Sequence, residues 1–214
     1  MSKRRSRSTD ESGFTLIELL ITVVIVGVIT LPLGNLVIGY FQNTAQTQAR
    51  ANVSHDEQIA ATYFSQDVAS VGMRNPDLTA KPSVWYPSTS AAPIACGSGV
   101  TPFLAVAWDE YSSSGTRTTS ESVYGTRSHS DNGRVERQLL RLRCANGSAI
   151  PVSTLVLAHN LVGTPTVACD GSSGACSNSA PLPSVIIMTI TLQDPELTSS
   201  ATYAVALAGQ RRQT

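Results

Sequence analysis

Residues 13–39 read GFTLIELLITVVIVGVITLPLGNLVIG, an apolar stretch with a single charged side chain, Glu18. As an α-helix, residues 14–40 would extend about 40 Å, more than the roughly 30 Å thickness of the hydrocarbon core of a bilayer. A secretory signal peptide has a shorter apolar core of about 7–15 residues, followed by a small-residue cleavage site. We therefore expect residues 14–40 to form a membrane-spanning helix.

Glu18 is the residue in this stretch that needs a physical explanation. A carboxylate inside the hydrocarbon costs roughly 2.5–3.5 kcal/mol near the bilayer centre and less near its edge. A positive charge that meets Glu18 inside the membrane would offset this cost.

The sequence GFTLIE at residues 13–18, followed by Leu19, Leu20 and Ile21, resembles the processing and methylation motif of type IV prepilins and type II secretion pseudopilins. The resemblance implies that a membrane prepilin peptidase cuts between Gly13 and Phe14 and methylates the new amino group of Phe14. It also implies that Glu18 faces the Phe14 amine of a neighbouring subunit during assembly. An uncleaved signal anchor with a tolerated glutamate is the alternative.

The segment before the apolar stretch, residues 1–13, would be the leader peptide. It contains four of the fifteen basic residues and two of the fifteen acidic residues of the chain. By the positive-inside rule its basic cluster stays in the cytoplasm, so a single-pass protein of the cytoplasmic membrane would carry everything after Tyr40 on the outer side. The remaining chain has a small net negative charge, and we expect no nucleic-acid partner.

The helical pattern continues beyond the apolar stretch, through residues 41–74. Apolar residues recur there at spacings of three, four or seven, at Phe41, Ala45, Ala49, Val53, Ala60, Phe64, Val68 and Val71. Gly72 and the Asn75-Pro76 pair indicate where the helix ends. We expect one helix from about Phe14 to Val71, whose second half has an apolar stripe to bury.

The rest of the chain, residues 75–214, has the composition of an antiparallel sheet domain. Residues 77–99 are rich in proline and serine and predict an irregular connection. Six short runs predict strands at residues 102–108, 122–125, 135–144, 154–158, 185–192 and 203–207. A meander of these strands, folded onto the stripe of the helix, predicts an α+β protein, which is also the pilin-like fold that the resemblance implies.

The order of elements after the helix is similar to that of J-type pseudopilins of type II secretion and of W-type minor pilins. It comprises a strand that ends in a tryptophan, a strand that contains Tyr124, and an arginine-rich strand. We interpret Arg137, Arg141 and Arg143 as a solvent-exposed face of the sheet, with a partner-contact surface as the alternative.

The four cysteines all follow the expected membrane span. An even number in an exported domain favours disulfides, and four cysteines allow three pairings, among which the sequence alone does not choose. The short segment between Cys169 and Cys176 makes that pair our first choice and leaves Cys96 to pair with Cys144.

Catalytic and metal-binding patterns are weak in this sequence. The three histidines have no metal-ligand spacing, and the acidic pair Asp109-Glu110 lacks the alternating carboxylates of a calcium loop. We expect no catalytic residues, no metal and no cofactor, and hence no enzyme.

The expected function is that of a structural subunit, a minor pilin or pseudopilin. Its partners would be the prepilin peptidase, other filament subunits, the inner-membrane assembly platform and, before assembly, membrane lipid. The alternatives are an adhesive or cargo-binding tip protein, acting through exposed residues such as Tyr111, Tyr124 and the arginines, or a DNA-uptake pseudopilin. The sequence does not distinguish a pilus from a secretion or competence system.

Overall fold

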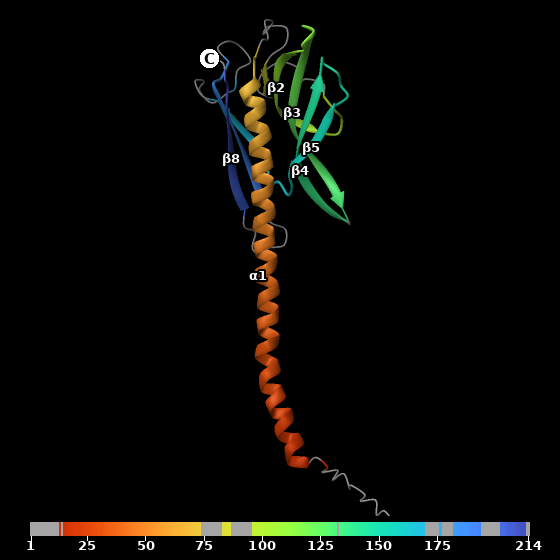
Figure 1. Ribbon diagram of the computed structural model, residues 1–214, viewed down its shortest axis with the longest axis vertical. Coiled ribbons are helices and arrows are strands. Elements are labelled where there is room, and N and C mark those ends of the chain that lie inside the picture. Colours follow the sequence, from red (N-terminus) through yellow and green to blue (C-terminus); the bar gives the residue numbers. More distant parts are fainter. Residues whose placement is uncertain are drawn as a thin grey trace, which may run out of the picture. The chain divides into compact units, whose positions relative to one another are not determined.

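The computed structural model describes residues 13, 15–73, 83–86, 96–131, 133–169, 176, 182–193 and 202–212 (Figure 1). The chain divides into two compact units, Met1–Gln46 and Thr47–Thr214, and each is described by itself. Phe14, at the expected cleavage site, lies outside the described residues.

One helix, α1 (Leu16–Ser70), contributes to both units. Its start has the local chemistry of a helix N-terminus, because the side-chain oxygen of Thr15 accepts a hydrogen bond from the backbone N–H of Glu18 at 3.4 Å. The helix passes through Pro32 without interruption. Its apolar part is long enough to cross a membrane, with a mean hydropathy of 2.6 over 18 residues that are all exposed.

The helix ends next to a glycine in the left-handed conformation. Gly72 has φ of +69°, which an L side chain rarely adopts, and a Cβ there would lie 2.6 Å from a methyl group of Leu182. Two backbone hydrogen bonds within the second unit hold this turn. Gly72 N–H donates to Ala107 O and Asp109 N–H donates to Met73 O, both at 3.1 Å.

The second unit contains two antiparallel sheets. The larger sheet has the order β1-β2-β3-β4-β5, and the smaller has the order β6-β7-β8. Their strands are β1 (Val84–Trp85), β2 (Thr101–Tyr111), β3 (Arg117–Asp131), β4 (Arg134–Ala145), β5 (Ser153–Ala158), β6 (Thr166–Cys169), β7 (Val185–Gln193) and β8 (Thr202–Gln210).

The α+β class and the antiparallel pairing of the strands are as expected. The prediction of a single sheet is wrong, because the strands form two sheets. All six predicted strands exist, whereas β1 and β6 were not expected, and β3 is far longer than residues 122–125. β1 and β6 have only two and four residues, too short for a periodic signal. β3 is rich in Ser, Thr and Arg, and its pairing with β2 and β4 rather than its own composition makes it a strand.

The two sheets are joined along one side by the segment between β5 and β6. Leu161 N–H donates to Arg137 O of β4 at 2.8 Å, and Leu161 also forms a β-bridge with Leu192 of β7. The last turns of α1 run between the two sheets (Figure 1). The main core therefore combines side chains of α1, such as Phe64 and Val68, with those of both sheets.

A second, smaller core covers the other face of the larger sheet. It contains Trp85, Leu140 and Leu142, together with the disulfide between Cys96 and Cys144. The middle of the larger sheet is therefore covered on both faces.

Candidate functional site

The first candidate site is the N-terminal part of α1, in the first unit. Glu18 is the only charged residue among the described residues of this unit, and it is exposed in the first turn of the helix. Large aliphatic side chains surround it, and Leu16, Ile17 and Leu19 are at least 60% exposed. Such a contiguous apolar surface is typical of a segment that contacts lipid or other helices.

Two threonine hydroxyls on this part of the helix are satisfied locally. The hydroxyl of Thr22 donates to Glu18 O at 2.5 Å, and the hydroxyl of Thr30 donates to Val26 O at 2.8 Å. Threonine side chains that bond back to the preceding turn can enter hydrocarbon without an unpaired donor. The carboxylate of Glu18 is the charged group on this surface, and burial in hydrocarbon would be costly for it without a partner.

Glycines on this surface have no side chain that projects from the helix backbone. A Cβ added at Gly27, Gly34 or Gly39 would meet nothing within 4 Å. Small residues at exposed helix positions allow the backbones of neighbouring membrane helices to approach closely.

The second candidate site lies inside the second unit and fixes α1 to the larger sheet. Asp67 of α1 is 2% exposed and forms a bidentate ion pair with Arg141 of β4: Nε donates to Oδ2 and Nη2 donates to Oδ1, each at 2.7 Å. Tyr124 of β3 donates its hydroxyl to Asp67 Oδ2 at 2.6 Å. We refer to Asp67, Arg141 and Tyr124 as the buried triad.

Aromatic rings surround the buried triad. The ring of Phe64 meets that of Tyr124 edge-on at 5.6 Å, and the Arg141 guanidinium lies 5.1 Å from the centre of the Tyr63 ring. Phe64, Tyr63 and Asp67 all belong to α1, so the helix supplies both the carboxylate and its apolar surroundings.

The pKa values of Tyr124 and Arg141 are both raised in the folded protein. Burial, followed by the negative charge and hydrogen bond of Asp67, raises the pKa of Tyr124 well above its usual value of 10.0. Burial lowers the pKa of Arg141, but its hydrogen bonds and ionic attraction to Asp67 outweigh this, so the pKa of Arg141 is raised above its usual value. Tyr124 is therefore neutral and Arg141 is charged at neutral pH.

The buried triad corrects two expectations. Arg141 is 7% exposed and Tyr124 is fully buried, so neither belongs to a solvent-exposed binding face. The alternation of apolar and polar residues correctly identifies β4 as a strand, but it does not show what covers each face. In the structure, α1 covers the face that carries Tyr124 and Arg141. Arg137 and Arg143 remain partly exposed.

Sequence analysis did not identify Asp67 as a functional residue. The signal was present, because Asp67 follows Phe64 by three positions and precedes Val68, and therefore lies on the apolar stripe of the helix. A carboxylate on such a stripe requires a buried cation, and Arg141 on a strand with alternating leucines was an available candidate.

The remaining predicted residues have structural partners. The acidic pair lies in β2: Asp109 is buried and pairs with Arg117 at 2.8 Å, and Glu110 pairs with Arg143 at 2.6 Å. Disulfides join Cys96 to Cys144 and Cys169 to Cys176, the pairing that the sequence favours. Within the described parts of the chain, no three His, Cys, Asp or Glu residues cluster as metal ligands.

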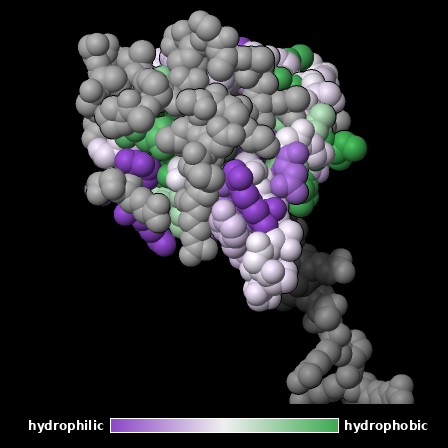
Figure 2. Space-filling view, turned by 90° about the horizontal axis from the view of Figure 1, so that it is seen from above, coloured by the Kyte–Doolittle hydropathy of each residue, from purple (hydrophilic) through white to green (hydrophobic). Residues whose placement is uncertain are grey.

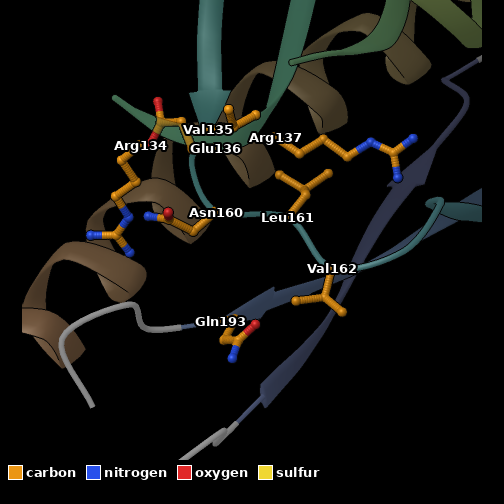
Figure 3. A pocket seen from close by; sticks show the side chains of 8 residues that line it. All are labelled: Arg134, Val135, Glu136, Arg137, Asn160, Leu161, Val162 and Gln193. Carbon is orange, nitrogen blue, oxygen red and sulfur yellow. The ribbon is translucent and has the colours of Figure 1, made fainter. Parts of the chain in front are cut away.

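A shallow pocket of about 330 Å³ opens where the start of β4, the segment after β5 and the end of β7 meet (Figure 3). Its charged side chains already have protein partners: Arg137 Nη1 donates to Gly163 O at 2.8 Å, and Glu136 accepts a hydrogen bond from Gln138. The described residues on the face shown in Figure 2 are partly hydrophilic and partly hydrophobic. Neither feature offers a converging set of groups for catalysis.

Comparison with known proteins identifies one match, and it lies in the N-terminal part of the chain. Residues 9–34 match the family model of the prokaryotic N-terminal methylation motif. No curated protein and no solved structure matches this chain. The matched residues include Gly13, Phe14 and Glu18, and they support a type IV pilin-like family.

Proposed function

We propose that this protein is a minor pilin or pseudopilin, a structural subunit that a prepilin peptidase processes between Gly13 and Phe14. The match to the N-terminal methylation motif carries this proposal. The exposed apolar helix and the disulfide-bonded antiparallel domain fit a membrane-anchored pilin whose C-terminal domain lies on the outer side of the cytoplasmic membrane. Proteins with this motif act as structural subunits rather than enzymes.

In this proposal, assembly depends on a charge pair between two subunits. Glu18 is exposed on an otherwise uncharged helix surface, and the methylated amine of Phe14 of a neighbouring subunit would supply the opposite charge. Each charge alone is costly in hydrocarbon, whereas the pair is much less so, and its position fixes the axial register of the packed helices. Within the second unit, the buried triad joins the end of α1 directly to β3 and β4.

The test is mass spectrometry of the mature protein from its native membrane. We expect a chain that begins at Phe14 and carries one methyl group on its amino terminus. A mature population that still contains residues 1–13 would contradict the proposal and favour an ordinary membrane anchor.

Deletion of the gene distinguishes a structural subunit from a tip protein of the same filament. Loss of a structural or initiating subunit lowers the number of filaments or the amount of secreted protein. Loss of a tip adhesin instead leaves the number of filaments unchanged and abolishes attachment only.

A further inference from the structure

The apolar part of α1 ends in an exposed pair of aromatic residues, Tyr40 and Phe41. They are 68% and 66% exposed, and their rings meet edge-on with centroids 6.2 Å apart. Both lie in the first unit, and among the described residues of that unit they are the only aromatic ones. The pair therefore occupies one defined level along the helix axis.

The chemistry of the helix surface changes at this level. The preceding segment, residues 19–39, contains no charged residue, and its large aliphatic side chains are at least half exposed. The following segment, residues 42–48, is polar except for Ala45. Aromatic rings with a polar end, such as that of tyrosine, are enriched where the hydrocarbon of a bilayer meets its headgroups. The pair thus lies where such a boundary would be.

The exposed apolar residues surround the helix rather than forming one stripe. Residues 23–26, all valine or isoleucine, follow each other over a full turn and are 52–64% exposed. A helix that is apolar all round is typical of a membrane span, whereas contact with one neighbour requires only a single stripe. Tyr40 and Phe41, as successive residues, also project about 100° apart around the axis. Lipid, which surrounds a helix on all sides, therefore fits this surface better than one neighbouring helix does.

The rise along the helix matches the thickness of a bilayer. Because α1 is continuous from Leu16 to Ser70, the rise from Glu18 to Tyr40 is about 33 Å at about 1.5 Å per residue. The hydrocarbon core of a bilayer is about 30 Å thick. When Tyr40 lies at one boundary of this core, Glu18 therefore lies at the other, and Ile29 lies midway between them.

We propose that Tyr40 and Phe41 bind the headgroup region on the outer side of the bilayer and thereby hold Glu18 at the inner headgroup region. The contact itself needs only a bilayer, whereas the assignment of outer and inner sides rests on the proposed function. At this depth the carboxylate of Glu18 costs less than at the bilayer centre, because headgroups and water reach it. A subunit in the membrane would then need a charge partner for Glu18 only once it leaves this depth.

The depth of α1 can be measured on the full chain in dioleoylphosphatidylcholine vesicles. All four cysteines form disulfides, so one introduced cysteine is the only free thiol and can carry a nitroxide spin label. Relaxation of the label by oxygen and by a water-soluble nickel complex gives its depth. We expect the Ile29→Cys label to be the deepest. The Leu19→Cys and Gln42→Cys labels should each lie within about 5 Å of a boundary of the hydrocarbon core.

Moving the aromatic pair tests whether it sets this depth. The moved-pair chain carries Val37→Tyr, Ile38→Phe, Tyr40→Ser and Phe41→Ser. In this chain the Leu19→Cys label should lie about 4–5 Å deeper, which is the rise of three residues. The control chain, with Tyr40→Trp and Phe41→Trp, keeps two aromatic rings at the original level and should leave the depth of this label unchanged. If the moved-pair chain does not insert, the three labels on the otherwise unchanged chain still decide where the pair lies.

Three results would overturn the proposal. One is a Gln42→Cys label inside the hydrocarbon core, and another is an unchanged depth of the Leu19→Cys label when the pair is moved. The third is efficient disulfide-linked dimers of a Phe41→Cys chain at a low ratio of protein to lipid, which would identify a neighbouring helix as the partner. Because leader cleavage does not enter these measurements, their outcome is separate from that of the proposed function.

Discussion

Arg141 and Asp67 lie 74 residues apart in the sequence, yet the guanidinium of one donates two 2.7 Å hydrogen bonds to both carboxylate oxygens of the other. This bidentate pair joins α1 to the middle of the larger sheet, and Tyr124 adds a third hydrogen bond. Burial makes the pair costly to break, because each partner would remain as an uncompensated charge.

Asp67→Asn should therefore lower the free energy of unfolding by about 3–5 kcal/mol. The measurement is urea unfolding of the full chain in detergent, followed by tryptophan fluorescence. The control is Asp56→Asn on the same helix: Asp56 pairs with His159, which is half-exposed, so the loss should be below about 1 kcal/mol. Equal losses for the two variants would contradict a special role of the buried pair.

Tyr124 should make stability fall at high pH. Its pKa is raised in the folded state, so the folded protein keeps a proton that the unfolded chain releases above pH of about 10. The stability gained from the neutral hydroxyl is fully present below that pH and is lost as the pH rises through the folded-state pKa. Unfolding measured between pH 8 and 11 should show a shallower decline for Tyr124→Phe, and an unchanged decline would exclude Tyr124 as its source.

Gly209→Ala should destabilise the contact between α1 and the smaller sheet. A Cβ at Gly209 would lie only 2.5 Å from Val68 Cβ and within 2.9 Å of both its methyl groups. Overpacking of this kind typically costs about 1–3 kcal/mol. The matched control is Ala208→Val, whose side chain is exposed and whose effect on thermal unfolding should stay within about 0.5 kcal/mol. A fully stable Gly209→Ala protein would show that the helix shifts without cost.

The two disulfides should contribute unequally to stability. The Cys96–Cys144 bridge spans 48 residues and the Cys169–Cys176 bridge spans 7. From the entropy of loop closure, replacing the first pair with alanine should cost about 4 kcal/mol and replacing the second about 2–3 kcal/mol. Urea unfolding of the two double-alanine variants provides the comparison, and the reverse order would show that enthalpic terms dominate.

Glu18→Gln should separate processing from assembly. The substitution keeps the size of the side chain and removes its charge, so cleavage after Gly13 should continue while incorporation into filaments falls at least tenfold. Immunoblots of membrane and filament fractions measure both quantities. Thr22→Val, one turn further along the exposed helix, is the neutral control, and normal incorporation of Glu18→Gln would argue against charge pairing.

The sequence by itself determined the elements whose signals are local. A long apolar stretch with one carboxylate indicates a membrane-spanning helix without reference to the rest of the chain, because composition and length decide membrane insertion. Gly72 ends the helix where expected, since its positive φ is a property of one residue and its neighbours. Five of the six longer strands were likewise visible from their own composition, whereas only residues 122–125 of β3 were.

Only the tertiary structure decided what covers each face of the strands. Alternation around Leu140 identifies two faces of β4, but the face of Arg141 is dry because Asp67 of a distant helix lies on it. The division into two sheets depends in the same way on pairings between segments far apart in the chain. Such pairings are governed by the total burial and hydrogen bonding of the assembled domain, and no single stretch of sequence contains that information.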